Sequence, residues 1–130
     1  MRDKSLEQLE KDSWREPQEC SSYLVKRAYE YRNKPLTDLT IEEIRLLISQ
    51  SIGLEHLVPL ALEKLDEDIL AVGDLYEGDL LFALAKIPNE FWRKHSILLT
   101  DLKENIKKNT AYIKSVIGEK KWNQLYNKLK

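Results

Sequence analysis

The feature that most constrains this chain is a helix-start signal near residue 40, followed by apolar residues at helical spacing. Thr40 can accept a hydrogen bond from the amide of Glu43, and the Glu43 side chain can reach back to the amide of Thr40. The apolar residues that then share one face of the helix are Ile41, Ile44, Leu47 and Ile48. This segment predicts an amphipathic helix that buries one face against the rest of the chain.

The residue types favour helices throughout the chain. Leucine and isoleucine together number 32, whereas valine, which suits strands better, numbers four. Glycine and proline are four each, too few for the turns of a many-stranded sheet. A length of 130 residues suits one domain with one core. We therefore expect an all-α, single-domain bundle of six to eight short helices over residues 1–130.

The N-terminal residues, 1–21, are expected to form an irregular arm that holds one short helix. Ser5 and Gln8 form a second capping-box pattern, and Trp14 is expected to pin the arm to the core. Ser21 or Ser22 should cap the next helix, which extends to about Arg32. Basic helices are expected over residues 96–130.

Four expectations concern the middle and the end of the chain. Gly53 should be the C-cap of the helix that Thr40 begins. Pro59 should lie in the first turn of the next helix, where proline costs little. Asp79 should cap a helix after the loop that runs from Gly73 to residue 78. A long helix should follow His95 and continue through residue 117, and Gly118 should break it before a last helix. The core is expected to contain Ile44, Leu47, Ile48, Leu60, Leu81, Leu84 and Trp92.

Charge is distributed unevenly along a chain whose net charge is only −1. Residues 38–79 contain eleven acidic and two basic residues, whereas residues 93–130 contain ten basic and three acidic residues. Such asymmetry is typical of a surface that meets a charged partner.

A cytoplasmic location is expected, because Cys20 is the single cysteine and the N-terminal residues lack the apolar core of a signal peptide. No apolar run approaches the roughly 18 residues of a membrane span, so no membrane partner is expected.

No residue pattern in the sequence encodes a reaction. Cys20 has no cysteine-enzyme signature around it, and His56 and His95 have no local partner that would make them catalytic. The acidic residues lack the alternating spacing of a calcium-binding loop, and no zinc or phosphate-binding motif is present. We therefore predict no catalytic residue, no metal and no cofactor.

The acidic stretch around residues 66–79 is the candidate binding site. It has no lysine or arginine from residue 65 to residue 85, and burial of all its acids would be costly, so most should face water. Charge runs are often plain solvated surface. The alternative is a landing site for a basic partner, with Tyr76 as an aromatic anchor. The candidate residues are Asp66, Glu67, Asp68, Asp74, Tyr76, Glu77 and Asp79.

Several segments together resemble one small helical family of immunity proteins of bacterial contact-dependent growth inhibition (CDI) systems. The resemblance covers about residues 5–95, and the basic end of the chain lies outside it. The segments that carry it are residues 22–25, 34–36, 39–50, 52–54, 57–63, 73–81 (Gly-Asp-Leu-Tyr-Glu-Gly-Asp-Leu-Leu) and 91–92.

The resemblance implies a cytoplasmic protein that binds the C-terminal toxin domain of a cognate CDI effector, as a heterodimer, and is not itself an enzyme. Such toxins are often nucleases, whose phosphate-binding clefts are basic and would be complemented by the acidic stretch. The residues alone leave two other functions open. The chain could be a helical adaptor or regulator of another basic protein, or a small nucleic-acid-binding protein that uses its basic C-terminal helices. We expect no direct binding of nucleic acid, because the acidic middle would repel it.

Overall fold

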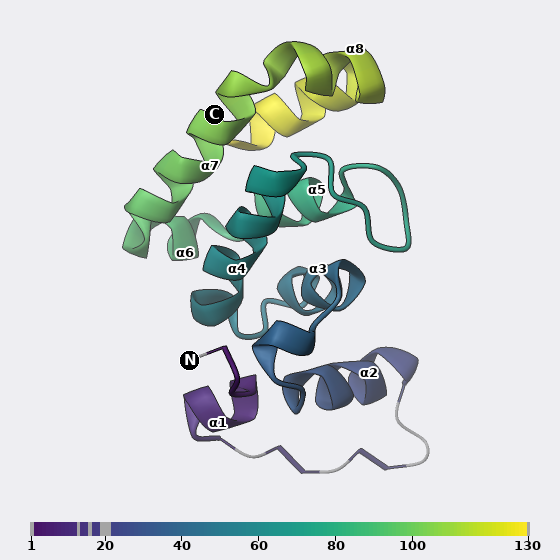
Figure 1. Cartoon of the computed structure of the whole chain (residues 1–130), viewed down its shortest axis with the longest axis vertical. Helices are drawn as coiled ribbons and strands as arrows, with labels where there is room; N and C mark the ends of the chain where they lie inside the picture. The colour runs from purple at the N-terminus through teal and green to yellow at the C-terminus, as the bar shows by residue number, and fades with distance from the viewer. Residues whose placement is uncertain (1, 13, 16, 19–21, 130) are drawn as a thin grey trace.

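The computed structural model describes residues 2–12, 14–15, 17–18 and 22–129, and within these residues the chain is all α-helical (Figure 1). The predicted fold class is confirmed: the described residues form eight α-helices and one short 3₁₀ helix, without a β-strand. The helices are α1 (Leu6–Glu10), α2 (Tyr23–Arg32), η1 (Leu36–Asp38), α3 (Ile41–Ser49), α4 (Leu54–Glu67), α5 (Asp79–Ala85), α6 (Asn89–Lys94), α7 (Ser96–Lys108) and α8 (Thr110–Leu129).

Helix α3 lies at the centre of the packing and begins as the sequence predicts. The Thr40 hydroxyl accepts from the Glu43 amide at 3.2 Å, and the Glu43 carboxylate accepts from the Thr40 amide at 2.9 Å. Helix α3 packs on α2, α4 and α5, while α7 covers α4 and α8 covers α5. All seven predicted core residues are buried in one cluster: Ile44, Leu47, Ile48, Leu60, Leu81, Leu84 and Trp92.

The N-terminal arm is attached to the core by backbone and side-chain contacts. The capping box of Ser5 and Gln8 is present, and Leu6 is fully buried. The guanidinium of Arg32, also buried, donates to Glu10 at 2.9 Å and lies 4.5 Å from the ring centre of Trp14. Trp14 therefore contacts α2, as a pinning role requires. Cys20 lies outside the described residues.

Two helix-boundary predictions near the start of α4 were wrong. Gly53 is the N-cap of α4 rather than the C-cap of α3, because α3 already ends at Ser49 and has Gln50 as its C-cap. Glycine is needed there for space as well as for its φ of +62°, since a Cβ atom would lie 2.7 Å from the methyl groups of Leu6. Pro59 lies inside α4 rather than in its first turn, because the helix begins at Leu54. The proline therefore removes one hydrogen bond within the helix.

The long helix expected after His95 is interrupted at Asn109, where α7 ends and α8 begins. The Asn109 side chain donates to the carbonyl oxygen of Asn105 at 2.8 Å, and Thr110 donates to that of Ile106 at 3.1 Å. Such local bonds compete with the backbone pattern of a continuous helix. Within α8, Gly118 takes a non-helical conformation and breaks the helix as expected, and the chain folds back there (Figure 1). The final turns of α8 therefore lie beside α7.

Candidate functional site

The candidate acidic stretch folds into the end of α4 and a loop over residues 68–78, which we call the acidic loop. The loop begins where Asp68 ends α4 and accepts from the Leu70 amide at 3.0 Å. Figure 1 shows it extending away from the bundle on the side opposite α6 and α7. Of its acidic side chains, Asp68, Asp74 and Glu77 are exposed.

Asp79 differs from the other candidates because its side chain is only 1% exposed. Its two carboxylate oxygens accept from the amide of Gly73 at 2.7 Å and from the amide of Leu75 at 3.0 Å. The predicted capping role was wrong, because Gly78 is the N-cap of α5 and Asp79 is its first helical residue. Asp79 instead fixes the backbone of the acidic loop and cannot itself contact a partner.

A second carboxylate, Glu42 of α3, holds the same loop. Glu42 accepts from the Asp74 amide at 2.9 Å and from the Arg45 guanidinium at 2.6 Å through both oxygens. The hydrogen bonds from Arg45, with that from the Asp74 amide, hold the pKa of Glu42 below its ordinary value. The loop approaches α3 so closely that a Cβ atom at Gly73 would lie 3.0 Å from the Glu42 Cα. The loop is thus fixed by two carboxylates from two helices.

Tyr76 lies on the acidic loop but is partly covered by α5 and α8. Its side chain is 36% exposed, and its ring meets Phe82 edge-on with ring centres 6.0 Å apart. The Lys121 ammonium of α8 lies 4.6 Å from the centre of the Tyr76 ring. Contact with a lysine was not expected, because the sequence around Tyr76 contains none.

The other candidates lie at the end of α4. Asp66, Glu67 and Asp68 are exposed, and Asp66 accepts from the Asn105 side chain of α7 at 3.1 Å. The structure therefore separates the candidate residues of the acidic stretch into different locations. Asp66 faces α7, whereas Asp74, Tyr76 and Glu77 lie on the acidic loop and Asp79 is buried beneath it.

A second acidic surface shares Asp66 with the candidate residues, but its other acidic residues were missed by the sequence analysis. Helices α4 and α7 border a groove of about 360 Å³ that carries four acidic side chains, and we call it the α4–α7 groove. Each helix contributes a pair spaced three residues apart, a spacing that places both members on one helix face. The spacing was visible in the sequence, but the pairing of α4 with α7 was not. The four acidic residues are Glu63, Asp66, Asp101 and Glu104.

Among the described residues, no group of three or more histidine, cysteine or acidic side chains could hold a metal ion. His56 and His95 are half-buried, and the His95 ring stacks on Phe91 with ring centres 4.3 Å apart. None of the described helices has the length and apolar character to cross a membrane.

Comparison with known proteins finds one family. The family model described as CDI immunity proteins matches residues 8–102, which includes α3, α4, the acidic loop and α5. No curated protein and no solved structure gives a significant match. The matched region ends within α7, so that α8 lies outside it.

Proposed function

Because the chain belongs to the CDI immunity proteins, a family whose role is toxin neutralisation, we propose that it binds the toxin domain of one cognate CDI effector. The partner is the C-terminal domain of that effector, and the complex is a heterodimer formed in the cytoplasm. The toxin is a nuclease with a basic cleft, and the immunity protein acts by covering that cleft. Proteins of this family are generally non-catalytic, so binding is the whole of the proposed activity.

The acidic loop, whose backbone is hydrogen-bonded to two carboxylates, is the observation that carries this proposal. Asp74 and Glu77 are exposed on a backbone that Asp79 and Glu42 hold in place from beneath. A surface fixed before binding loses little conformational entropy when the partner arrives. Exposed carboxylates also attract a basic partner over distance and so raise the association rate.

We assign the toxin-binding surface to the exposed candidates, which are Asp66, Glu67, Asp68, Asp74, Tyr76 and Glu77. Asp79 belongs to the support beneath them. Charge reversal at Glu67 and Glu77 is expected to slow association, whereas Tyr76→Ala is expected to raise the dissociation rate. Because Tyr76 also packs on Phe82, the stability of its variant must be measured beside its affinity.

The test uses the toxin domain of the cognate effector, whose gene we expect to lie immediately upstream of the gene for this chain. The purified domain is mixed with the immunity protein, and the stoichiometry, the affinity and the degradation of RNA and DNA by the toxin are measured. We expect a one-to-one complex and complete loss of nuclease activity at equal concentrations. A toxin that degrades neither nucleic acid but is still neutralised would disprove the nuclease assignment alone. Absence of binding and of protection would disprove the proposed function.

A further inference from the structure

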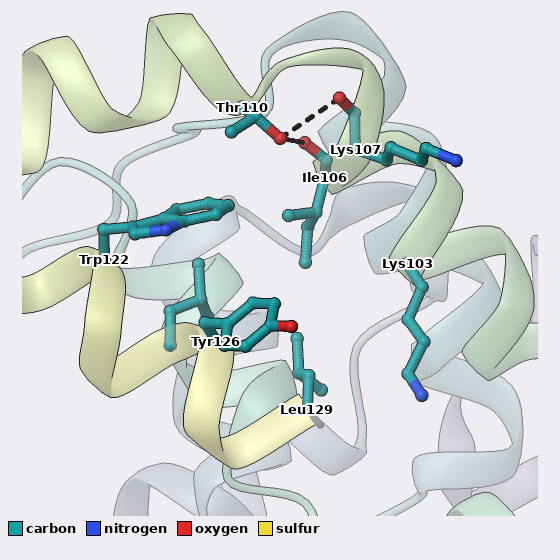
Figure 2. A pocket seen from close by; sticks show the side chains of 8 residues that line it. Lys103, Ile106, Lys107, Thr110, Trp122, Tyr126 and Leu129 are labelled. Carbon is teal, nitrogen blue, oxygen red and sulfur yellow. Dashed lines mark hydrogen bonds between the residues drawn. The ribbon is translucent and has the colours of Figure 1, made fainter.

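The C-terminal helices form an apolar groove that the proposed function does not use. It has a volume of about 410 Å³ and lies between α7 and the part of α8 that follows Gly118 (Figure 2). We call it the α7–α8 groove. Its apolar lining includes Ile106 from α7 and Trp122, Leu125 and Leu129 from α8. A groove of this size can enclose one aliphatic or aromatic side chain of a partner.

The charge at the edges of this groove is positive. Lys103 and Lys107 extend from α7 on one side, opposite Trp122 and Tyr126 on the other (Figure 2). The Lys114 ammonium lies 5.3 Å from the ring centre of Trp122. None of the eight lining residues is acidic. The groove therefore suits an apolar side chain carried by an acidic segment.

The acidic loop of the same protein has that chemistry. Leu75 is 62% exposed and Val72 is 48% exposed, and Asp74 and Glu77 flank Leu75. The hydrogen bond from the Leu75 amide to Asp79 fixes the backbone from which the leucine side chain projects. Since Leu75 is largely exposed, it does not occupy the groove of its own molecule. The described chain thus carries an acidic loop with an exposed leucine and a basic groove with an apolar lining. Within one molecule the leucine does not lie in the groove.

We propose that two copies of this protein associate by inserting Leu75 of one copy into the α7–α8 groove of the other. Asp74 and Glu77 then lie near Lys103 and Lys107, so that charge favours the contact that apolar burial stabilises. The acidic loop and the α7–α8 groove are different surfaces. A single contact therefore joins two copies head-to-tail, whereas two reciprocal contacts close a symmetric dimer. The inference does not depend on the proposed function.

The groove is a property of this chain rather than of the matched family region. All eight lining residues lie between 103 and 129, beyond the last residue that the family model matches. Self-association also uses the loop to which we assign toxin binding. A copy whose loop lies in a neighbour's groove therefore cannot present that loop to the toxin.

The test is the average mass of the full chain in sedimentation equilibrium over a range of concentrations. At about 50 mM salt the mass is expected to rise with concentration, and at about 500 mM the rise should weaken, because salt screens exposed charges. Leu75→Ala, or Lys103→Glu with Lys107→Glu, should each weaken association about tenfold or more. Ile97→Ala is the control for loss of an apolar side chain, because Ile97 is 77% exposed on α7 and does not line the groove.

A mixing experiment identifies the two surfaces directly. The Leu75→Ala variant retains the groove, and the variant reversed at Lys103 and Lys107 retains the loop. Each variant alone should associate at least about tenfold more weakly than the wild type, whereas an equal mixture should form a heterodimer with one of each. A wild-type chain that stays monomeric at every concentration would overturn the proposal, as would a mixture that does not associate. A monomeric wild type whose toxin affinity depends on Lys103 and Lys107 would also overturn it and assign the groove to the toxin.

Discussion

At the scale of single residues, Asp79 and Glu42 decide the conformation of the acidic loop. The Asp79 carboxylate accepts hydrogen bonds from two backbone amides of the loop, and the Glu42 carboxylate accepts one from a third. The loop itself lacks regular secondary structure. Hydrogen bonds to a charged acceptor are stronger than those between neutral groups, and Asp79 makes two of them out of contact with water. The loop is therefore ordered by side chains rather than by backbone pairing.

Replacement of the buried carboxylate should therefore destabilise the protein. Asp79→Ala is expected to lower the free energy of unfolding by about 2–3 kcal/mol, because two shielded amides lose a charged acceptor. Asp74→Ala removes an exposed carboxylate from the same loop, and its effect should stay within about 0.5 kcal/mol. Urea denaturation of both variants measures the difference. Equal losses would show that Asp79 does not support the loop.

The lowered pKa of Glu42 predicts a pH dependence of stability. A carboxyl whose pKa is lower in the folded state stabilises the fold above its unfolded-state pKa, and that stabilisation is lost as pH falls through the folded-state pKa. We expect the free energy of unfolding to decrease as the pH is lowered from about 5. Glu42→Gln should be less stable than the parent at pH 7 but lose less on acidification. Parallel pH profiles for the two proteins would contradict the assignment.

At the scale of helices, the start of α3 follows from local chemistry. Thr40→Ala removes the acceptor for the Glu43 amide and should cost about 1 kcal/mol of unfolding free energy. Thr37→Ala is the matched control, because Thr37 is an exposed threonine outside the α3 cap. Thermal denaturation compares the two. Toxin affinity should be unchanged once folding is accounted for, and a large affinity loss at normal stability would place Thr40 in the interface.

Some elements could be predicted from the sequence because their causes are local. The capping boxes of Ser5 and Thr40 and the fold at Gly118 depend on residues within one turn. The close approach of Leu6 to Gly53 could not be predicted, because the two residues are distant in sequence. The break at Asn109 was missed because the apolar spacing continues across it while polar side chains redirect the backbone.

At the scale of the whole molecule, one core joins helices from both ends of the chain. Leu6 of α1 and Leu125 of α8 belong to the same buried cluster as Leu47 of α3. The helical fold and the seven core residues could be predicted, since apolar periodicity reports which face of a helix is buried. The site could be predicted only in part. Which acids would be buried and which would meet α7 depends on how helices pair, and no local pattern encodes that.

The central position of α3 makes its core face sensitive to mutation. Leu47 is fully buried, and Leu47→Ala should lower the free energy of unfolding by about 2–5 kcal/mol through loss of burial and formation of a cavity. Chemical denaturation followed by circular dichroism measures the loss. A change within error of zero would be incompatible with this packing.

The most direct test of toxin binding through the acidic loop and the adjoining end of α4 is the association rate of the cognate toxin domain at low salt. Two double variants are compared with the parent. The first carries Glu67→Lys and Glu77→Lys. The second carries Asp101→Lys and Glu104→Lys in the α4–α7 groove. Both pairs change the net charge equally, so the general attraction of a basic toxin is weakened alike. We expect the first pair to slow association about tenfold or more, and the second to slow it much less. Equal slowing, or greater slowing by the α4–α7 pair, would contradict the assignment of toxin binding to the acidic loop and the adjoining end of α4.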